Sequence, residues 1–207
     1  MSPIDPAPGG PGKPRPRALP PLGVCERVAF YCEENVHRLL GRPELAGRPA
    51  WALVVSNADR VVPMLRQLAG QPPDGLVLWD YHVVALVADA RSGARVLDLD
   101  AMLGFPLPLK AWLRSSFAPR TPPRLRPRFR LIPAEDYLAG LVSDRSHMLN
   151  ADGSWKAPPP SWPAPGADSG RPNTLLDWVD LEKPGPGLVT DLRGLAAFPF
   201  SARTSVP

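Results

Sequence analysis

Three residues of this 207-residue chain could act together as a nucleophile, a base and an orienting acid. They are Cys32, His82 and Asp98, in that order along the chain. A thiolate attacks carbonyl carbons, a neighbouring imidazole can take up the thiol proton, and a carboxylate can hold that imidazole in the required tautomer. The chemistry predicted for such a set is acyl transfer through a cysteine-bound intermediate.

The candidate nucleophile is expected at or near the start of a helix. Residues 30–41, FYCEENVHRLLG, carry two acids where a first turn would lie and end in a glycine, which is a stop signal. The apolar side chains fall on one helical face, namely those of Cys32, Val36, Leu39 and Leu40. A helix N-terminus and a nearby imidazole both lower the pKa of a thiol, so this position favours an activated cysteine.

The histidine and the aspartate are expected on the two strands of a β-hairpin. Residues 76–87 and 94–99 are rich in β-branched and apolar residues and are separated by a polar turn centred near Arg91. Paired residue numbers would then sum to roughly 180 to 183, which puts His82 opposite Asp98 or within about two residues of it. Asp100 would share the face of Asp98, so strand geometry leaves either carboxylate as the partner. A histidine that is simply satisfied at a strand end is the alternative without chemistry.

The other elements of regular structure predict the α+β class rather than repeated βαβ units. Residues 51–56 and 128–132 are predicted strands, and residues 107–117 and 133–142 are predicted helices. The resulting order is a helix first, followed by mostly antiparallel strands with helices on their flanks.

Loops and caps complete the prediction. Residues 57–70 are expected to form a loop and a short helix with Pro63 in its first turn, where a proline is tolerated. Two short C-terminal helices are expected, one capped by Asn173 or Thr174 and one by Thr190.

The composition fits one globular domain with long loops. The chain is 44% hydrophobic, which is enough for a core, but it also contains 30 prolines and 17 glycines. Residues 1–21 are rich in proline and glycine and are expected to be a disordered tail. Residues 22–207 are expected to form a single catalytic domain.

Charge and cysteine content limit the partners and the location. The net charge of +4 is modest, and the basic stretch 114–130 lacks interleaved aromatic residues, so no nucleic-acid partner is expected. No stretch has the length of a membrane span or the pattern of a secretory signal. Cys25 and Cys32 form neither a disulfide framework nor a C-x-x-C motif, which fits a reducing cytoplasm. Nothing such as a heptad repeat suggests more than a monomer.

The remaining candidate residues have simpler interpretations. Cys25 is expected to be a small apolar residue, and His37 and His147 are expected to be a solvated helix residue and a structural one, respectively. A metal site built from Asp80, His82, Asp98 and Asp100 would lack a second histidine at ligand spacing, so no metal or other cofactor is predicted.

Several short strings stand out between residues 31 and 195: YCEEN at 31–35, SN at 56–57, WDYHVV at 79–84, DLD at 98–100, FR at 129–130, SDRSHM at 143–148 and PPP at 158–160. Together they resemble the protein N-terminal glutamine amidohydrolase family, over roughly residues 31–195. The resemblance implies an α-β-α sandwich related to transglutaminases and papain-like hydrolases, with Cys32 as nucleophile, His82 as base and Asp98 rather than Asp100 as orienter. The N-terminal tail and the loops at 118–127 and 164–172 depart from the family pattern.

The activity that this resemblance implies is hydrolysis of the side-chain amide of an N-terminal glutamine, with proteins or peptides as substrates and ammonia as product. Four residues are candidates for contacting the substrate, three acids for its α-amino group and one aromatic wall: Glu34, Asp80, Asp144 and Trp79. The alternatives are a transglutaminase or thiol protease of related fold, and a non-catalytic scaffold that binds a partner through its basic Pro/Arg segments.

Overall fold

The computed structural model describes residues 18–89 and 93–200. Most of the expected tail, residues 1–17, lies outside these ranges, as does the turn expected near Arg91. The first element is a 3-10 helix, η1 (Leu22–Val24). Among the described residues, none of the helices combines the length and the apolar character needed to span a bilayer.

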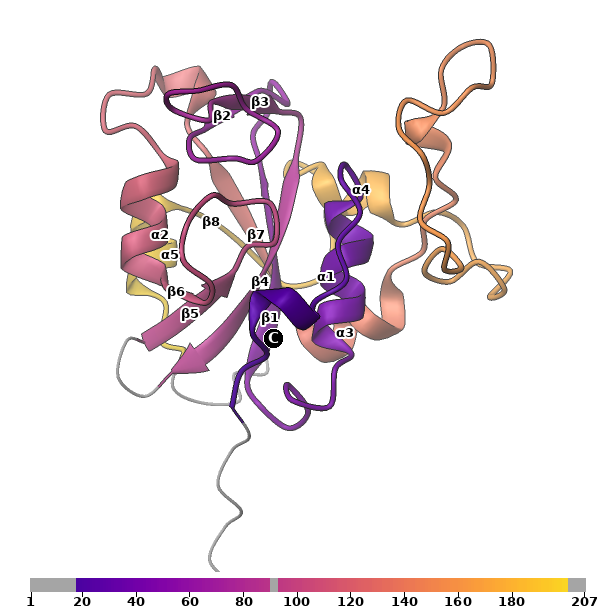
Figure 1. Cartoon of the computed structure of the whole chain (residues 1–207), viewed down its shortest axis with the longest axis horizontal. Coiled ribbons are helices and arrows are strands. Elements are labelled where there is room, and N and C mark those ends of the chain that lie inside the picture. The colour runs from indigo at the N-terminus through magenta and orange to yellow at the C-terminus, as the bar shows by residue number, and fades with distance from the viewer. Residues whose placement is uncertain (1–17, 90–92, 201–207) are drawn as a thin grey trace, which may run out of the picture.

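A six-stranded antiparallel sheet forms the centre of the fold, in the order β6-β5-β4-β1-β7-β8 (Figure 1). Its strands are β1 (Ala50–Ser56), β4 (His82–Asp89), β5 (Gly93–Leu97), β6 (Leu107–Pro108), β7 (Arg128–Pro133) and β8 (Leu188–Asp191). The two central strands, β1 and β4, are apolar along nearly their whole length because both of their faces are covered. The predicted mixed class with a mostly antiparallel central sheet is confirmed.

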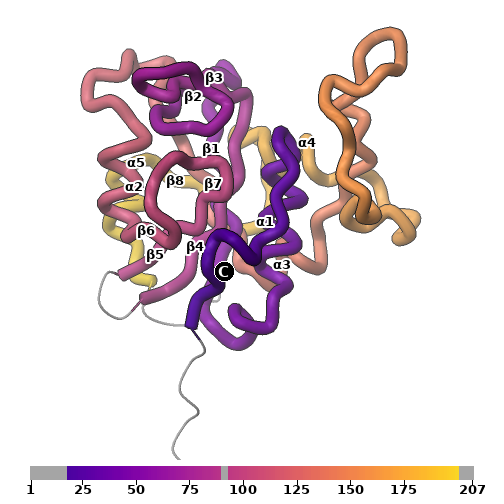
Figure 2. Tube along the Cα trace, in the orientation of Figure 1, coloured from indigo at the N-terminus to yellow at the C-terminus, as the bar shows by residue number. Residues whose placement is uncertain are grey.

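Helices cover both faces of this sheet, as Figures 1 and 2 show. One face carries α1 (Cys32–Leu40), α3 (Ala134–Gly140) and α4 (Leu175–Val179), and the other carries α2 (Leu109–Ser116) and α5 (Leu192–Ala197). Alternate residues of β1 point to opposite sides, so that Ala52 and Val54 pack under α1 while Leu53 and Val55 pack under α2 and α5. The result is two apolar cores separated by one sheet.

The β4–β5 hairpin has the predicted register, since Ala85 pairs with Leu97 and Asp89 pairs with Gly93. The first predicted strand, however, is two strands. Residues 77–79 form β3 (Val77–Trp79), which pairs with β2 (Val62–Met64) in a separate ribbon, and β4 starts only at His82. The break lies at Asp80, whose side chain accepts the Tyr81 N–H at 2.9 Å and whose carbonyl accepts the Ser56 hydroxyl at 2.7 Å.

Two other local predictions are wrong. Residues 62–64 form β2 rather than a helix, because the β-branched neighbours of Pro63 favour a strand and a two-stranded ribbon tolerates a proline. Strand β8 was not expected, and α5 is capped by Asp191, whose Oδ1 accepts the Gly194 N–H at 2.9 Å, rather than by Thr190. At α4 the expected Asn173 does accept a first-turn N–H, that of Leu175.

Candidate active site

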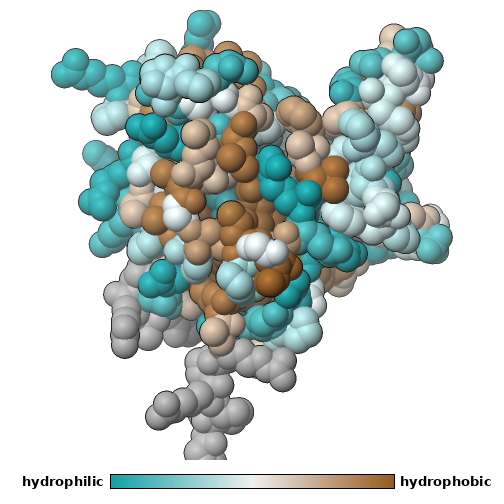
Figure 3. Space-filling view, viewed as in Figure 1, coloured by the Kyte–Doolittle hydropathy of each residue, from teal (hydrophilic) through white to brown (hydrophobic). Residues whose placement is uncertain are grey.

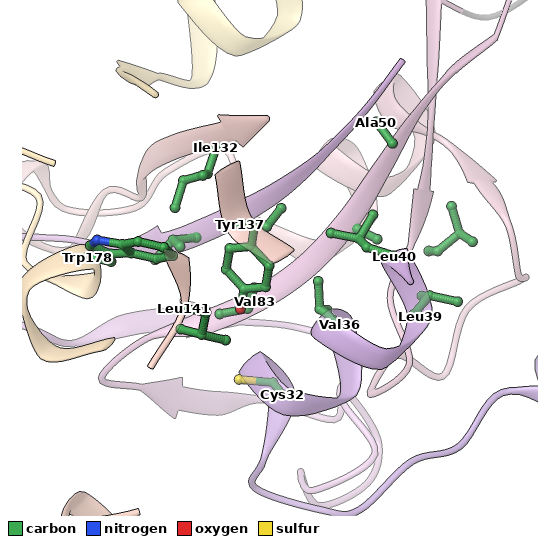
Figure 4. Packing of buried hydrophobic residues seen from close by; sticks show 14 of the residues in the cluster. Cys32, Val36, Leu39, Leu40, Ala50, Val83, Ile132, Tyr137, Leu141 and Trp178 are labelled. Carbon is green, nitrogen blue, oxygen red and sulfur yellow. The ribbon is translucent and has the colours of Figure 1, made fainter. Parts of the chain in front are cut away.

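Cys32 is the first residue of α1 and is buried, with 6% of its surface exposed. Val36, Leu39 and Leu40 fix the helix against the sheet, so the helix start is held over β4 (Figure 4). The backbone of Val83, the neighbour of His82, lies close enough to the thiol to lower its pKa. The predicted helix start is therefore confirmed, and it lies at the first residues of β4.

His82 and Asp98 form a buried hydrogen-bonded pair. His82 Nε2 lies 3.0 Å from Asp98 Oδ1, and both side chains are almost completely enclosed. The Asp98 carboxylate also accepts the indole N–H of Trp112 at 3.0 Å and the backbone N–H of Asp100 at 3.1 Å. The carboxylate is thereby fixed in orientation, and it in turn fixes the imidazole.

The electrostatics of this pair favour its charged form. Burial opposes charge on His82, but the carboxylates of Asp98, Asp100 and Glu33 outweigh it and raise the pKa of the imidazole. Burial also opposes ionisation of Asp98, but His82 and the two hydrogen-bond donors prevail and lower its pKa. An imidazolium formed during a reaction would thus be stabilised where it stands.

The second nitrogen of His82 remains available. Its Nδ1 is buried and has no hydrogen-bond partner among the described residues. The indole of Trp79 stacks on the ring, with centroids 5.3 Å apart and planes 14° from parallel. This stacking restricts the imidazole to one plane, so that Asp98 and Trp79 together determine its position.

The thiol of Cys32 lies closer to carboxylate groups, and is more buried, than the sequence indicated. Burial, followed by the carboxylates of Glu33 and Asp100, raises the pKa of Cys32 well above its usual value, although the nearby backbone of Val83 lowers it. The lowering of the thiol pKa expected from the helix N-terminus and a nearby imidazole is opposed here by desolvation and the neighbouring acids.

A pocket of about 290 Å³ opens over the thiol. Its lining comes from the start of α1, the β3–β4 corner and the segment after α3: Phe30, Cys32, Arg60, Trp79, Asp80, Tyr81, His147, Met148, Lys156 and Ala157. The pocket therefore joins the thiol to the indole that stacks on His82. A pocket of this volume can admit one side chain of a substrate but not the surface of a folded protein.

The four predicted substrate-binding residues divide into two pairs. Trp79 and Asp80 line the pocket. Glu34 is fully buried and does not line it, because both carboxylate oxygens are occupied by Arg145, at 2.7 and 2.8 Å, and one also accepts the Trp162 indole N–H. Asp144 is exposed and does not line the pocket either, and its Oδ1 accepts hydrogen bonds from Ser146 and Asn173. Glu34 and Asp144 hold the pocket wall in place.

Several residues that the sequence did not single out contribute to the site. Glu33 and Tyr81 belong to the strings YCEEN and WDYH, which carry the family resemblance, but the sequence assigned neither residue a role. Trp112 gave no signal, because a helix residue 14 positions from Asp98 has no pattern that links the two. Arg27 lies before α1 and forms hydrogen bonds and an ion pair with Asp100 at 2.7 to 2.8 Å.

The same acids could be considered as metal ligands. His82, Asp98 and Asp100 offer atoms that all lie within 4.8 Å of one another. Each group already has protein partners, because His82 bonds Asp98 and Arg27 bonds Asp100. The geometry of this cluster is accounted for by these contacts.

Comparison with known proteins identifies the family of this chain. The model of the family described as N-terminal glutamine amidase matches residues 27–198, which include every residue of the site. The chain belongs to the N-terminal glutamine amidase family. Relatives named protein N-terminal glutamine amidohydrolase include one from Drosophila grimshawi, 40% identical over 184 residues, which are 84% of this chain and 88% of the relative. One from Bos taurus is 34% identical over 171 residues, 80% of this chain and 82% of the relative. The predicted family is thereby confirmed.

Proposed function

We propose that this amidase hydrolyses the side-chain amide of an N-terminal glutamine in peptides or proteins, leaving glutamate and releasing ammonia. The observation that carries this proposal is a buried Cys32 at a pocket the size of one side chain, whose wall Trp79 stacks on the imidazole of a hydrogen-bonded His82–Asp98 pair. The family relatives carry the name of this activity.

In the proposed reaction, Cys32 is the nucleophile, His82 the acid and base, and Asp98 the orienting group. Because Nε2 of His82 is engaged by Asp98, Nδ1 is the nitrogen that takes the thiol proton. The thiolate attacks the side-chain carbonyl carbon, and the unpaired first-turn N–H groups of α1 are suited to stabilise the oxyanion. The imidazolium then protonates the departing nitrogen, and ammonia leaves a thioester on Cys32.

Water completes the cycle. His82 takes a proton from a water molecule, which attacks the thioester carbon, and the C–S bond breaks. The thiol recovers its proton and the product is a glutamate side chain. The stabilised imidazolium supports both halves of the cycle, since His82 is protonated in each tetrahedral intermediate.

Substrate positioning falls to the pocket lining in this proposal. The Trp79 indole forms an apolar wall next to the imidazole, against which the methylenes of the glutamine side chain would lie. Asp80 gives the pocket mouth a negative charge, with Arg60 3.4 Å away. Asparagine is one methylene shorter, and a misplacement of about 1 Å can cost a hundredfold in rate.

The proposed relation to transglutaminases and papain-like hydrolases rests on the helix-borne cysteine and the histidine and aspartate from adjacent strands. Those enzymes would give a cross-link or a cut chain from the same thioester chemistry. Both cysteines are free thiols, which supports the proposed cytoplasmic location.

Ammonia release tests the proposal. The protein and Cys32→Ala should be incubated with peptides that begin with glutamine, with asparagine and with N-acetylglutamine. We expect ammonia only from the free N-terminal glutamine and only with Cys32 present, together with a mass gain of one unit on the peptide, since NH is exchanged for O. Cleavage of the peptide backbone, or equal activity of Cys32→Ala, would contradict the proposal.

A further inference from the structure

Glu33 is a fully buried acid next to the candidate nucleophile. Its Oε2 accepts a hydrogen bond from the Tyr81 hydroxyl at 3.2 Å and from the Cys32 thiol at 3.6 Å. Its Oε1 has no hydrogen-bond partner among the described residues, and the nearest cationic candidate is His147 Nε2 at 3.5 Å. Glu33 therefore lacks the full set of partners that a buried carboxylate normally has.

The neighbouring acid on the same helix shows what a satisfied carboxylate looks like here. Glu34 is equally buried but receives two bonds from the guanidinium of Arg145 and one from the indole of Trp162. The fold can thus supply a permanent cation to a buried acid of α1. It supplies none to Glu33, although an unpaired buried charge is costly.

The position of this charge opposes the proposed chemistry in the free enzyme. Burial and the Glu33 carboxylate are the two largest causes that raise the pKa of the Cys32 thiol. The other acids that act on the thiol each have a cation nearby, because Asp100 is paired with Arg27 and Asp80 lies 3.4 Å from Arg60. Glu33 is the acid whose charge a ligand could still offset.

The two residues that supply the hydroxyl and the imidazole next to Glu33 also line the pocket. Tyr81 and His147 both line the pocket with Cys32, and the Tyr81 hydroxyl lies 3.2 Å from His147 Nε2. Because the Tyr81 hydroxyl donates its proton to Glu33, its oxygen is left as an acceptor. With that proton on Glu33's side, His147 Nε2–H donates to the Tyr81 oxygen. The acceptors that this cluster of Glu33, Tyr81 and His147 leaves for a ligand are a second lone pair of that oxygen, His147 Nδ1 and Glu33 Oε1, with the negative charge of Glu33 behind them.

An N-terminal glutamine substrate carries a cation, its α-ammonium group, that would reach the neighbourhood of Glu33. In an N-terminal glutamine only Cα, Cβ and Cγ separate the α-amino nitrogen from the carbon that the thiolate attacks. An α-ammonium group must therefore lie within one side-chain length of the sulfur during the reaction, and the Glu33 cluster lies within that range of Cys32.

We propose that the cluster of Glu33, Tyr81 and His147 is the subsite for the α-ammonium group of the substrate, and that the bound ammonium activates Cys32 by offsetting the charge of Glu33. This inference rests on the proposed function and adds a mechanism of specificity to it. A chain with a blocked N-terminus would bind less well and would also meet a thiol that stays protonated. Recognition of the N-terminus and activation of the nucleophile are then one event.

A kinetic experiment tests the recognition. The kcat/KM for a glutamine-initiated peptide should be compared with that for its desamino analogue, in which hydrogen replaces the α-amino group. We expect Glu33→Gln to lower kcat/KM for the amino peptide by about ten- to a hundredfold, the range for a lost bond to a charged group, and to affect the desamino peptide much less. Tyr81→Phe should act in the same direction. Glu135→Gln, the same change at an exposed first-turn acid of α3, should leave the ratio unchanged.

An alkylation experiment tests the activation without using the reaction. The rate of Cys32 modification by iodoacetamide should be measured against pH, with and without glycyl-alanine, whose amine can enter the subsite without a side chain to cover the thiol. We expect glycyl-alanine, but not N-acetyl-glycyl-alanine, to shift the alkylation profile of the wild type to lower pH. In Glu33→Gln the profile should lie at lower pH from the start and should respond little to the dipeptide.

The outcomes separate this inference from the proposed function. If the wild type releases ammonia from glutamine peptides but Glu33→Gln keeps the same preference for the amino peptide over its desamino analogue, the subsite is elsewhere. If glycyl-alanine leaves the wild-type alkylation profile unmoved, the activation is refuted, whether or not the variants fold. If the wild type releases no ammonia from any glutamine peptide, the proposed function itself fails.

Discussion

The carboxylate of Asp98 has three partners, and each of them restricts its position. The imidazole of His82, the indole of Trp112 and the backbone N–H of Asp100 all lie 3.0 to 3.1 Å from its oxygens. Asp100 is close by but is held by Arg27 instead. The distinction between these two acids, which strand alternation left open, can therefore be tested by changing them one at a time.

We predict that Asp98→Asn lowers kcat for ammonia release by about 10⁴-fold, because an amide can hold the imidazole in the wrong tautomer and cannot stabilise the imidazolium. Asp100→Asn should lower kcat far less, since Asp100 acts on His82 electrostatically and forms no hydrogen bond with it. Steady-state kinetics with circular dichroism as a folding check would measure both. A larger loss from Asp100→Asn than from Asp98→Asn would reverse the assignment.

The pH dependence of kcat/KM follows from the same charges. In the proposed mechanism Cys32 and His82 together must lose one proton before the thiolate–imidazolium pair exists, and the surrounding acids raise the pKa values of both groups. We therefore predict that kcat/KM rises with increasing pH. In Asp100→Asn this ascending limb should move to lower pH, because one of the charges that retain the proton is gone. A limb that stays in place, or moves to higher pH, would mean that Asp100 does not act on these two groups.

At the scale of elements, one segment forms a wall of the pocket without belonging to the sheet. The chain after α3 stands away from the rest of the molecule as a long loop (Figures 1 and 2) and supplies His147, Met148, Lys156 and Ala157 to the pocket. Contacts with the start of α1 tie it down, among them Arg145 to Glu34, the Trp162 indole to Glu34, and the Tyr31 hydroxyl to the Ala157 carbonyl at 3.0 Å. Arg145 holds a left-handed backbone conformation, with φ 59°, at the base of this segment.

We predict that Arg145→Met lowers the free energy of unfolding by about 3–5 kcal/mol, because it leaves the Glu34 carboxylate buried and unpaired. It should also raise KM, since the wall would no longer be fixed. Adding Glu34→Gln to Arg145→Met should recover part of the stability, which a double-mutant cycle in urea would measure. Lys183→Met, which breaks the exposed pair with Asp177, is the control and should change neither quantity. If Arg145→Met and Lys183→Met had equal effects, the pair of Arg145 with Glu34 would not be what holds the pocket wall.

How much of this could be predicted depends on the range of the interaction. The start of α1 and the β4–β5 register follow from local patterns, and these predictions are confirmed. At α4, where Asn173 or Thr174 was predicted as the cap, Thr174 holds the cap position and Asn173 accepts the Leu175 N–H. Strand β8 was not predicted because it is short and half-exposed at the sheet edge, so that its pairing with β7 and not its own sequence determines its conformation.

The candidate site, too, could be predicted only as far as local sequence patterns reach. The residue types and the family strings predicted Cys32, His82 and Asp98, but local sequence does not report burial. In the structure desolvation, followed by the buried Glu33 carboxylate, raises the pKa of the thiol, where a helix N-terminus and a nearby imidazole had suggested the opposite. Trp112 comes from the far side of the sheet to reach Asp98, a contact that no spacing rule provides.

For the molecule as a whole, the apolar surface is not confined to the pocket. Apolar side chains gather on the face where the segment before α1 crosses the loop between β5 and β6 (Figure 3). Exposed residues of this kind include Phe30, which lines the pocket, and Met102, which lies after β5. The segment before α1 is therefore part of the folded domain, and Arg27 connects it to Asp100.

This connection predicts where the catalytic domain begins. We expect that removal of residues 1–17, a proline-rich and basic stretch, leaves the melting temperature and kcat/KM unchanged, because the site contacts found in the described part of the chain already join residues from Arg27 onward. Removal of residues 1–27 should lower both, since it deletes Arg27 and leaves the buried Asp100 without its cation, next to Cys32 and His82. Differential scanning calorimetry and ammonia release on the two truncated proteins would measure the effects. Arg27→Met in the full chain separates the two causes: if it reproduces the loss from the longer deletion, the ion pair is responsible, and if it leaves the protein unchanged, the ion pair does not set the boundary of the domain.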